Sequence, residues 1–251
     1  MPFTTPINYT PPDQMLKGVL HKPSISSFVD NYFAQGGSAG AILNGDNSSY
    51  APGQWVNAIS LPGIITINLS DVTATANANP NIGSWYGAYI SIILHELGHA
   101  FYATAMAGGY TTVPAERLEW CYNREAYASM FVYDFIVNNG YVQDELIVPG
   151  PGIPGDLYPI LAAAVAGEVV GSKKYKDKLL AAARAKFSTN KRYREICTKF
   201  AYGQGLPPAY FPPVIPDSSG HTPGGVVPMP IPYVALIPKV YAIWNPPNVS
   251  N

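Results

Sequence analysis

Charged side chains are scarce in this chain. Only 12% of its 251 residues are Asp, Glu, Lys or Arg, about half the usual share. The 15 basic and 16 acidic residues leave a net charge of −1 at pH 7. A chain so close to neutrality has no overall attraction to nucleic acid or to an anionic membrane, so we expect neither as a partner. Ten of the basic residues lie in 173–199, which we interpret as a solvated helical face rather than an anion-binding patch.

Targeting signals and long apolar runs are also missing. The first ten residues, MPFTTPINYT, contain neither a basic nor an apolar segment, so no signal peptide is visible. No apolar run reaches the length that a membrane span requires. Three interpretations remain: a cytosolic protein, a protein exported without a classical signal, and a module of a longer exported protein.

Cysteine is rare too. Cys121 and Cys197 permit at most one disulfide within the chain, and the sequence does not decide whether they pair. Hydrophobic residues, by contrast, make up 47% of the chain, and a chain of this length can bury a substantial core. Tyrosine is frequent, with 18 residues, and a surface rich in Tyr, Ser, Thr and Asn is commoner in exported proteins.

The expected elements are two helices, a few strands and then a longer series of helices. Two β-like runs, 55–61 and 64–69, are separated by the turn dipeptide Pro62 and Gly63. The glycine-rich segment 36–40 is expected to be a flexible loop, and the polar, Asn-rich segment 70–83 a second loop. Helical patterns are predicted over 13–20, 24–34, 84–106, 114–137, 157–170, 173–187 and 190–202. Ser84 is in position to cap the helix that it precedes.

One stretch, 92–101, places two imidazoles and a carboxylate in an apolar run. On a helix, His95 and His99 are one turn apart on the same face, where both can bind one metal ion. Two neutral imidazoles at this spacing suit Zn²⁺. Glu96 lies about 100° further round the helix, where it can act on a water molecule without being a ligand.

The alternative is that these histidines are ordinary surface or core residues. However, Glu96 is the only charged residue in 90–107. The helix is therefore expected to be largely buried, and unpartnered His and Glu side chains would be costly there. We therefore favour a metal site.

A third ligand must come from elsewhere, and Glu125 is the candidate. It lies 26 residues after His99, in the middle of an apolar or small-residue stripe of the next predicted helix. This separation allows the chain to turn and return beside the metal helix, which would complete a His₂Glu zinc site suited to hydrolysis. The alternative is a buried glutamate paired with Arg117 or Arg124.

Together these segments resemble the gluzincin branch of the zincin metallopeptidases, the thermolysin-like arrangement of HExxH on one helix and Glu on the next. The matching residues are 95–99 (HELGH) and 123–126 (NREA). The resemblance covers about 45 residues, in 90–134. It departs at Ser129, where the family's segment usually carries an Asp that orients a ligand histidine.

The resemblance implies a zincin-like α+β fold, with a small mixed or antiparallel sheet beside the active-site helix. The expected organisation is an N-terminal lobe over 1–110 with the sheet and the HExxH helix, and a mainly helical lobe over 111–205 with the third zinc ligand. The last segment, 206–251, holds 12 of the 25 prolines together with large apolar residues. We expect it to pack in extended form on the body.

The resemblance also implies a mechanism. Glu96 would act as general base on a zinc-activated water and then return the proton to the leaving amine. Thermolysin-like enzymes add a Tyr or His donor to the oxyanion. Tyr202 and His221 are the candidates for this role, because they follow the helical lobe.

Two functions remain in view. The leading hypothesis is a monomeric zinc endopeptidase that acts on a protein or peptide substrate, as a secreted or translocated effector or toxin domain. The alternative is a non-catalytic, zinc-stabilised interaction module that uses the Pro/Tyr-rich tail as its contact surface. Glu96, which a structural zinc does not need, favours the enzyme.

Overall fold

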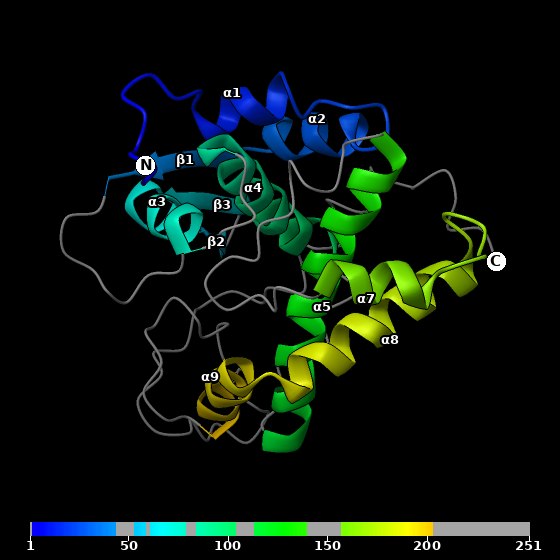
Figure 1. Ribbon diagram of the computed structural model, residues 1–251. Helices are drawn as coiled ribbons and strands as arrows, with labels where there is room; N and C mark the ends of the chain where they lie inside the picture. The colour runs from blue at the N-terminus through cyan, green and yellow to red at the C-terminus, as the bar shows by residue number, and fades with distance from the viewer. Residues whose placement is uncertain are drawn as a thin grey trace.

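The computed structural model describes residues 2–43, 53–58, 61–78, 84–103, 113–139 and 157–202. Helices predominate and the strands form one small sheet, which agrees with the predicted α+β class (Figure 1). In chain order the elements are α1 (Pro12–Lys17), α2 (Ser26–Ala34), β1 (Ser38–Ile42), β2 (Gly53–Ala58), β3 (Leu61–Asn68), α3 (Leu69–Ala78), α4 (Trp85–Phe101), α5 (Pro114–Asn139), α7 (Leu157–Ala164), α8 (Lys173–Thr189) and α9 (Lys191–Tyr202). Within these described ranges, no helix combines the length and the apolar character that crossing a membrane requires.

The sheet has the strand order β1-β3-β2. β1 pairs with β3 in parallel, with Ser38 opposite Ile64, while β2 pairs with β3 antiparallel. Ile65 and Ile67 of β3 are completely buried and Ile64 is 43% exposed, so this part of the strand has the alternation expected from the sequence. The predicted turn at Pro62 and Gly63 is wrong, because both residues lie inside β3.

The flexible loop predicted over 36–40 is also wrong, since β1 begins at Ser38. A Cβ atom on Gly37 would lie 2.6 Å from the carbonyl oxygen of Tyr32 and 2.7 Å from its ring. Gly37 therefore serves close packing of the chain on α2. The Tyr32 hydroxyl lies 2.9 Å from the carbonyl oxygen of Ser38 and 2.7 Å from that of Gly63, which joins α2 to two strands.

A second predicted loop, 70–83, is a helix in its first part, because α3 runs to Ala78. Leu69, Val72 and Ala76 are buried on one face, and this spacing of three to four residues stabilises a helix against the core. Before the helix, the side chain of the buried Asn68 donates to Asp71 Oδ2 at 2.7 Å. The Oδ1 atom of Asn68 also accepts a hydrogen bond from the backbone N–H of Asp71 at 3.4 Å, so Asn68 caps the start of α3.

The helix α4 lies between the sheet and α5, and α5 extends away from it to pack against α8 and α9 (Figure 1). One cluster of buried side chains runs from α1 and α2 through α4 and α5 to α9. The helix that carries His95 and His99 therefore occupies the centre of the described core. It ends at Phe101 rather than at the predicted residue 106.

The helices after residue 113 largely follow the prediction, because α5, α8 and α9 each begin within one residue of the expected position. α7 is shorter than expected and ends at Ala164 rather than at 170. Gly167 and Gly171 follow it with positive φ angles of 78° and 79°, a conformation that ends a helix. The proline-rich segment 206–251 lies outside the described residues.

Candidate metal centre

Ser84 begins the helix that carries the motif, as predicted. Its side chain accepts a hydrogen bond from the backbone N–H of Gly87 at 3.1 Å, which satisfies one of the unpaired donors at the helix start. The apolar residues that follow hold α4 inside the core. As a result His95, Glu96 and His99 are only 8%, 5% and 3% exposed.

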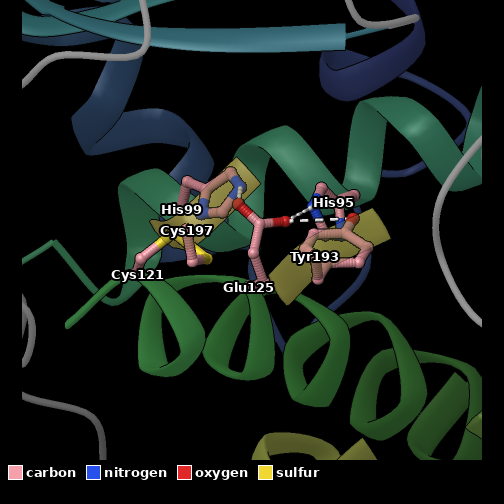
Figure 2. A network of polar contacts seen from close by, with 6 residues as sticks. All are labelled: His95, His99, Cys121, Glu125, Tyr193 and Cys197. Atoms are coloured by element: carbon pink, nitrogen blue, oxygen red, sulfur yellow. Dashed lines mark hydrogen bonds and ion pairs between the residues drawn. A yellow bond between two sulfur atoms is a disulfide. The ribbon is translucent and has the colours of Figure 1, made fainter. Parts of the chain in front are cut away.

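Three donor groups converge between α4 and α5. The Nε2 atom of His95 lies 3.4 Å from Glu125 Oε2, and the Nε2 atom of His99 lies 3.8 Å from Glu125 Oε1. Figure 2 shows the Glu125 carboxylate between the two imidazoles. One ligand atom from each residue lies within 4.8 Å of the others, so these three side chains could hold a metal ion.

Gly98 explains how a short carboxylate side chain spans the gap between the two helices. It lies between the two histidines in sequence and packs against α5. A Cβ atom on Gly98 would stand 3.0 Å from the Cα and the carbonyl oxygen of Ala128, and 3.0 Å from the Cβ of Phe131. Because the residue has no side chain, α4 and α5 approach closely, one turn from Glu125.

The alternative partners of Glu125 have contacts of their own. Arg117 donates to the carbonyl oxygen of Phe200 at 2.8 Å and lies 4.8 Å from the centre of its ring. Arg124 lies 5.7 Å from the centre of the Trp120 ring. Among the ion pairs of the described residues, those of Glu125 are with the two histidines and not with either arginine.

The ionisation states suit cation binding. Burial raises the pKa of Glu125, but the hydrogen bond and charge of His95 outweigh this effect, and the net pKa is lowered. The carboxylate therefore stays ionised at neutral pH. Burial, followed by the charges of Arg124 and His95, holds the pKa of His99 well below its usual value. His99 is therefore a neutral imidazole, the form that binds a metal.

His95 differs from His99 because it faces two carboxylates. Burial lowers the pKa of His95, whereas the hydrogen bond to Glu125 and the charges of Glu96 and Glu125 raise it, and the net pKa is raised. In the metal-free protein, His95 and Glu125 therefore stabilise each other's charged forms. A divalent cation would take over the stabilisation of Glu125 that protonated His95 supplies.

The other ring nitrogens of the two imidazoles, the Nδ1 atoms, are buried as well. Neither Nδ1 atom has a hydrogen-bond partner within the described residues, and the same holds for the Oγ atom of the fully buried Ser129. Within the described residues, neither His95 nor His99 thus has the carboxylate or carbonyl partner that commonly orients a ligand histidine. Asp134, the next carboxylate along α5, interacts instead with Tyr175 and Lys176 of α8.

One site residue was missed by the sequence analysis. The hydroxyl of Tyr193, on α9, donates a hydrogen bond to Glu125 Oε2 at 3.4 Å (Figure 2). Tyr202, the tyrosine that was predicted, is nine residues further along α9, about 13 Å along the helix axis. Its side chain is 57% exposed. His221, the other predicted oxyanion donor, lies outside the described residues.

The two cysteines, whose pairing the sequence left open, form a disulfide between α5 and α9 with a Cα–Cα distance of 5.6 Å. Cys121 precedes Glu125 by four residues, and Cys197 follows Tyr193 by four residues. A pattern of two cysteines, each four residues from a polar side chain, is thus the signal that could have pointed to Tyr193.

Comparison with protein-family models, with curated proteins and with solved structures finds no match to this chain. Function is therefore inferred from the chemistry of the centre itself.

Proposed function

We propose that this protein is a zinc-dependent endopeptidase of the gluzincin type. The observation that carries the proposal is the convergence of His95, His99 and Glu125, with the buried Glu96 adjacent to His95 in sequence. A purely structural metal site has no need of that second carboxylate. Burying an ionisable side chain in an apolar core is costly, so the presence of Glu96 there favours a role for it in chemistry.

The donor set fits zinc. Two imidazole nitrogens and one carboxylate oxygen are the protein ligands of hydrolytic zinc sites, which leave a further position open. His95, His99 and Glu125 would hold the ion. When bound, zinc supplies a Lewis acid that activates water and polarises a carbonyl group at neutral pH.

The remaining chemistry belongs to side chains of this chain. Glu96 would take a proton from the attacking water and deliver it to the nitrogen of the departing amine. Tyr193 would donate a hydrogen bond to the oxygen of the scissile carbonyl as negative charge develops there. Its hydroxyl lies 3.4 Å from Glu125 Oε2, which puts it beside the proposed metal site.

The disulfide supports action outside a reducing cytosol. Disulfides persist in secreted and periplasmic proteins and are rare where glutathione keeps thiols reduced. We therefore place the enzyme in an oxidising compartment, as a secreted or translocated effector or toxin domain. The alternative, a zinc-stabilised interaction module, depends on the Pro/Tyr-rich tail, which lies outside the described residues.

Replacement of Glu96 with Gln tests the proposal. The zinc-loaded Glu96→Gln protein should retain one zinc per chain and the same circular dichroism, and should lose peptide hydrolysis by at least about 1,000-fold. Hydrolysis is measured on a peptide library by mass spectrometry, and zinc by elemental analysis. Glu116→Gln, at an exposed position in the first turn of α5, is the matched control and should remain active. Full activity of Glu96→Gln would refute the mechanism.

A further inference from the structure

Two of the contacts between α5 and α9 lie one helical turn apart. Cys121 is bonded to Cys197, and Glu125 is hydrogen-bonded to Tyr193. The two helices are therefore antiparallel, and the disulfide and the tyrosine contact lie on the same side of each helix (Figure 2). The separation of four residues places the covalent bond directly beside the contact that brings Tyr193 to the metal centre.

α9 also has contacts near both of its ends, among them the hydrogen bond from Arg117 of α5 to the carbonyl oxygen of Phe200. Near its start, the Tyr193 ring contacts Phe187 of α8, with 4.5 Å between ring centroids. Near its end, the Phe200 ring stacks on Trp120 at 5.4 Å. Positions 191, 194, 195, 198, 199 and 202 are exposed. A helix of 12 residues is marginally stable alone, so its position depends on these contacts and on the crosslink, which is the attachment one turn from Tyr193.

The three metal ligands depend on a different contact. His95 and His99 are on α4 and Glu125 is on α5, and the close packing of Gly98 on Ala128 holds these helices together. None of the three ligands is on α9. Loss of the α5–α9 crosslink would therefore release Tyr193 without removing a ligand.

We propose that Cys121 and Cys197 are positioning residues whose disulfide holds Tyr193 at the metal centre, so that turnover depends on the oxidised state of this pair. The proposal rests on the proposed zinc peptidase function. Reduction removes the covalent link of α9 to α5 one turn from Tyr193, and the Tyr193 hydroxyl leaves the position from which it stabilises the oxyanion. The enzyme is therefore active in an oxidising compartment and nearly inactive in a reducing one, with zinc bound in both.

The reductive step can be made with a phosphine, which does not compete for zinc as a dithiol does. The phosphorus lone pair attacks one sulfur and expels the other cysteine as a thiolate. Water then adds at phosphorus, which releases the second cysteine and yields the phosphine oxide. Two electrons pass from phosphorus to the two sulfurs, and water supplies the oxygen and both thiol protons.

The experiment compares zinc-loaded full-length protein before and after phosphine treatment, with a thiol count to establish that the bond is open. We expect kcat on a peptide substrate to fall about 100-fold, the usual effect of losing one oxyanion donor. KM should change less than about twofold, zinc should stay at one per chain, and reoxidation should restore kcat. Hydrogen–deuterium exchange should accelerate at the amides of 191–197 and not in α4.

Two variants make the interpretation specific. Tyr193→Phe should lose about as much kcat as reduction does, and reduction should then cause no further loss, because both changes remove the same hydroxyl. The double variant Cys121→Ala/Cys197→Ala should match the reduced wild type and be insensitive to phosphine. If the double variant does not fold, reduction of the folded wild type remains the decisive measurement.

The outcomes separate the two proposals. A reduced protein with free thiols that keeps both kcat and the slow exchange of α9 overturns the positioning role. If the oxidised, zinc-loaded protein cleaves no peptide in the library, the peptidase proposal fails by itself. In that case faster exchange at 191–197 on reduction still supports positioning of Tyr193 by the disulfide, and unchanged exchange refutes it.

Discussion

Gly98 of α4 packs directly on Ala128 of α5, so closely that a Cβ atom on Gly98 would come within 3.0 Å of the Ala128 Cα and carbonyl oxygen. The contact joins the helix that carries both histidines to the helix that carries Glu125. The contacted atoms of Ala128 are backbone atoms of a long helix, so they cannot move away as a flexible side chain can. The distance between the three candidate ligands is therefore set by the absence of a side chain at position 98.

Gly98→Ala should widen this contact. We expect a loss of about 1–3 kcal/mol in the free energy of unfolding, typical of overpacking a well-packed core, and a weaker zinc affinity because Glu125 moves away from the histidines. Urea denaturation and zinc titration measure the two effects. Gly40→Ala is the control, since a Cβ atom there meets nothing within 4 Å. Equal stability of the two variants would show that α4 and α5 tolerate the extra methyl group.

Removal of the third candidate ligand should affect the metal more than the fold. Glu125→Ala should lower zinc affinity by more than the roughly 10- to 100-fold that loss of an outer-sphere partner costs. Competition with a chromogenic chelator provides the measurement. Glu119→Ala, on the same helix, removes a carboxylate that pairs with Arg184 and should leave the affinity unchanged. Native affinity in Glu125→Ala would mean that the zinc set must be reassigned.

The two tyrosines of α9 should behave differently. Tyr193→Phe should reduce kcat of the zinc-loaded enzyme about 100-fold, because it removes a hydroxyl that reaches the centre. It should weaken zinc binding by no more than the roughly 10- to 100-fold that loss of an outer-sphere partner costs. Tyr202→Phe changes a side chain that is 57% exposed and should have little effect. Steady-state kinetics on one peptide substrate distinguishes the two. The reverse order of effects would restore Tyr202 as the oxyanion donor.

Asp134 should give a pH-dependent effect on stability away from the metal centre. Burial raises the pKa of this carboxyl, only partly offset by Lys176 and Tyr175, and its Oδ1 atom is a buried acceptor without a hydrogen-bond partner in the described structure. A raised folded-state pKa favours folding at low pH, and that contribution is lost as the pH rises through the folded-state pKa.

Asp134→Asn, which cannot ionise, should therefore be more stable than wild type at pH 7, by about 1 kcal/mol. Its advantage should disappear below the unfolded-state pKa of about 3.9. Urea denaturation at pH 7 and pH 3 checks both halves of the prediction. A destabilised Asp134→Asn at pH 7 would mean that the positive charge of Lys176 stabilises the Asp134 carboxylate by more than burial costs it.

The sequence predicted best those features that are written in one continuous segment. α5 was expected over 114–137 and runs from Pro114 to Asn139, because its apolar residues repeat with the helical period over many turns. Ser84 was recognised as a cap for the same reason: the capping bond reaches only to Gly87. The pairing of His95 with His99 can be predicted for the same reason, because the two residues lie one turn apart on one helix.

Composition was misleading where small or polar residues serve packing. β1 was taken for a loop because it follows glycines, yet Gly37 is required by the ring of Tyr32. The polar, Asn-rich composition of 70–83 predicts a loop, although Leu69, Val72 and Ala76 already show a helical spacing. Burial of that face outweighs the weak helix propensity of the polar residues.

Contacts between distant segments are the hardest to predict from the sequence. Tyr193 meets Glu125 across 68 residues, and its spacing of four residues from Cys197 is informative only once Cys197 is known to pair with Cys121. Glu125 was found because the chemistry of zinc demands a third ligand, which narrows the search to acidic residues on the next helix. An oxyanion donor places no such demand on sequence position.

The disulfide that spans 76 residues of sequence has one more consequence, which concerns cleavage of the chain itself. Cys121 and Cys197 close a covalent ring that contains most of α5 and all of α7 and α8. A protease that cuts one peptide bond inside this ring opens it without separating its ends. Tyr193 and Glu125 would stay on a single molecule, and the nick would be visible only on a reducing gel.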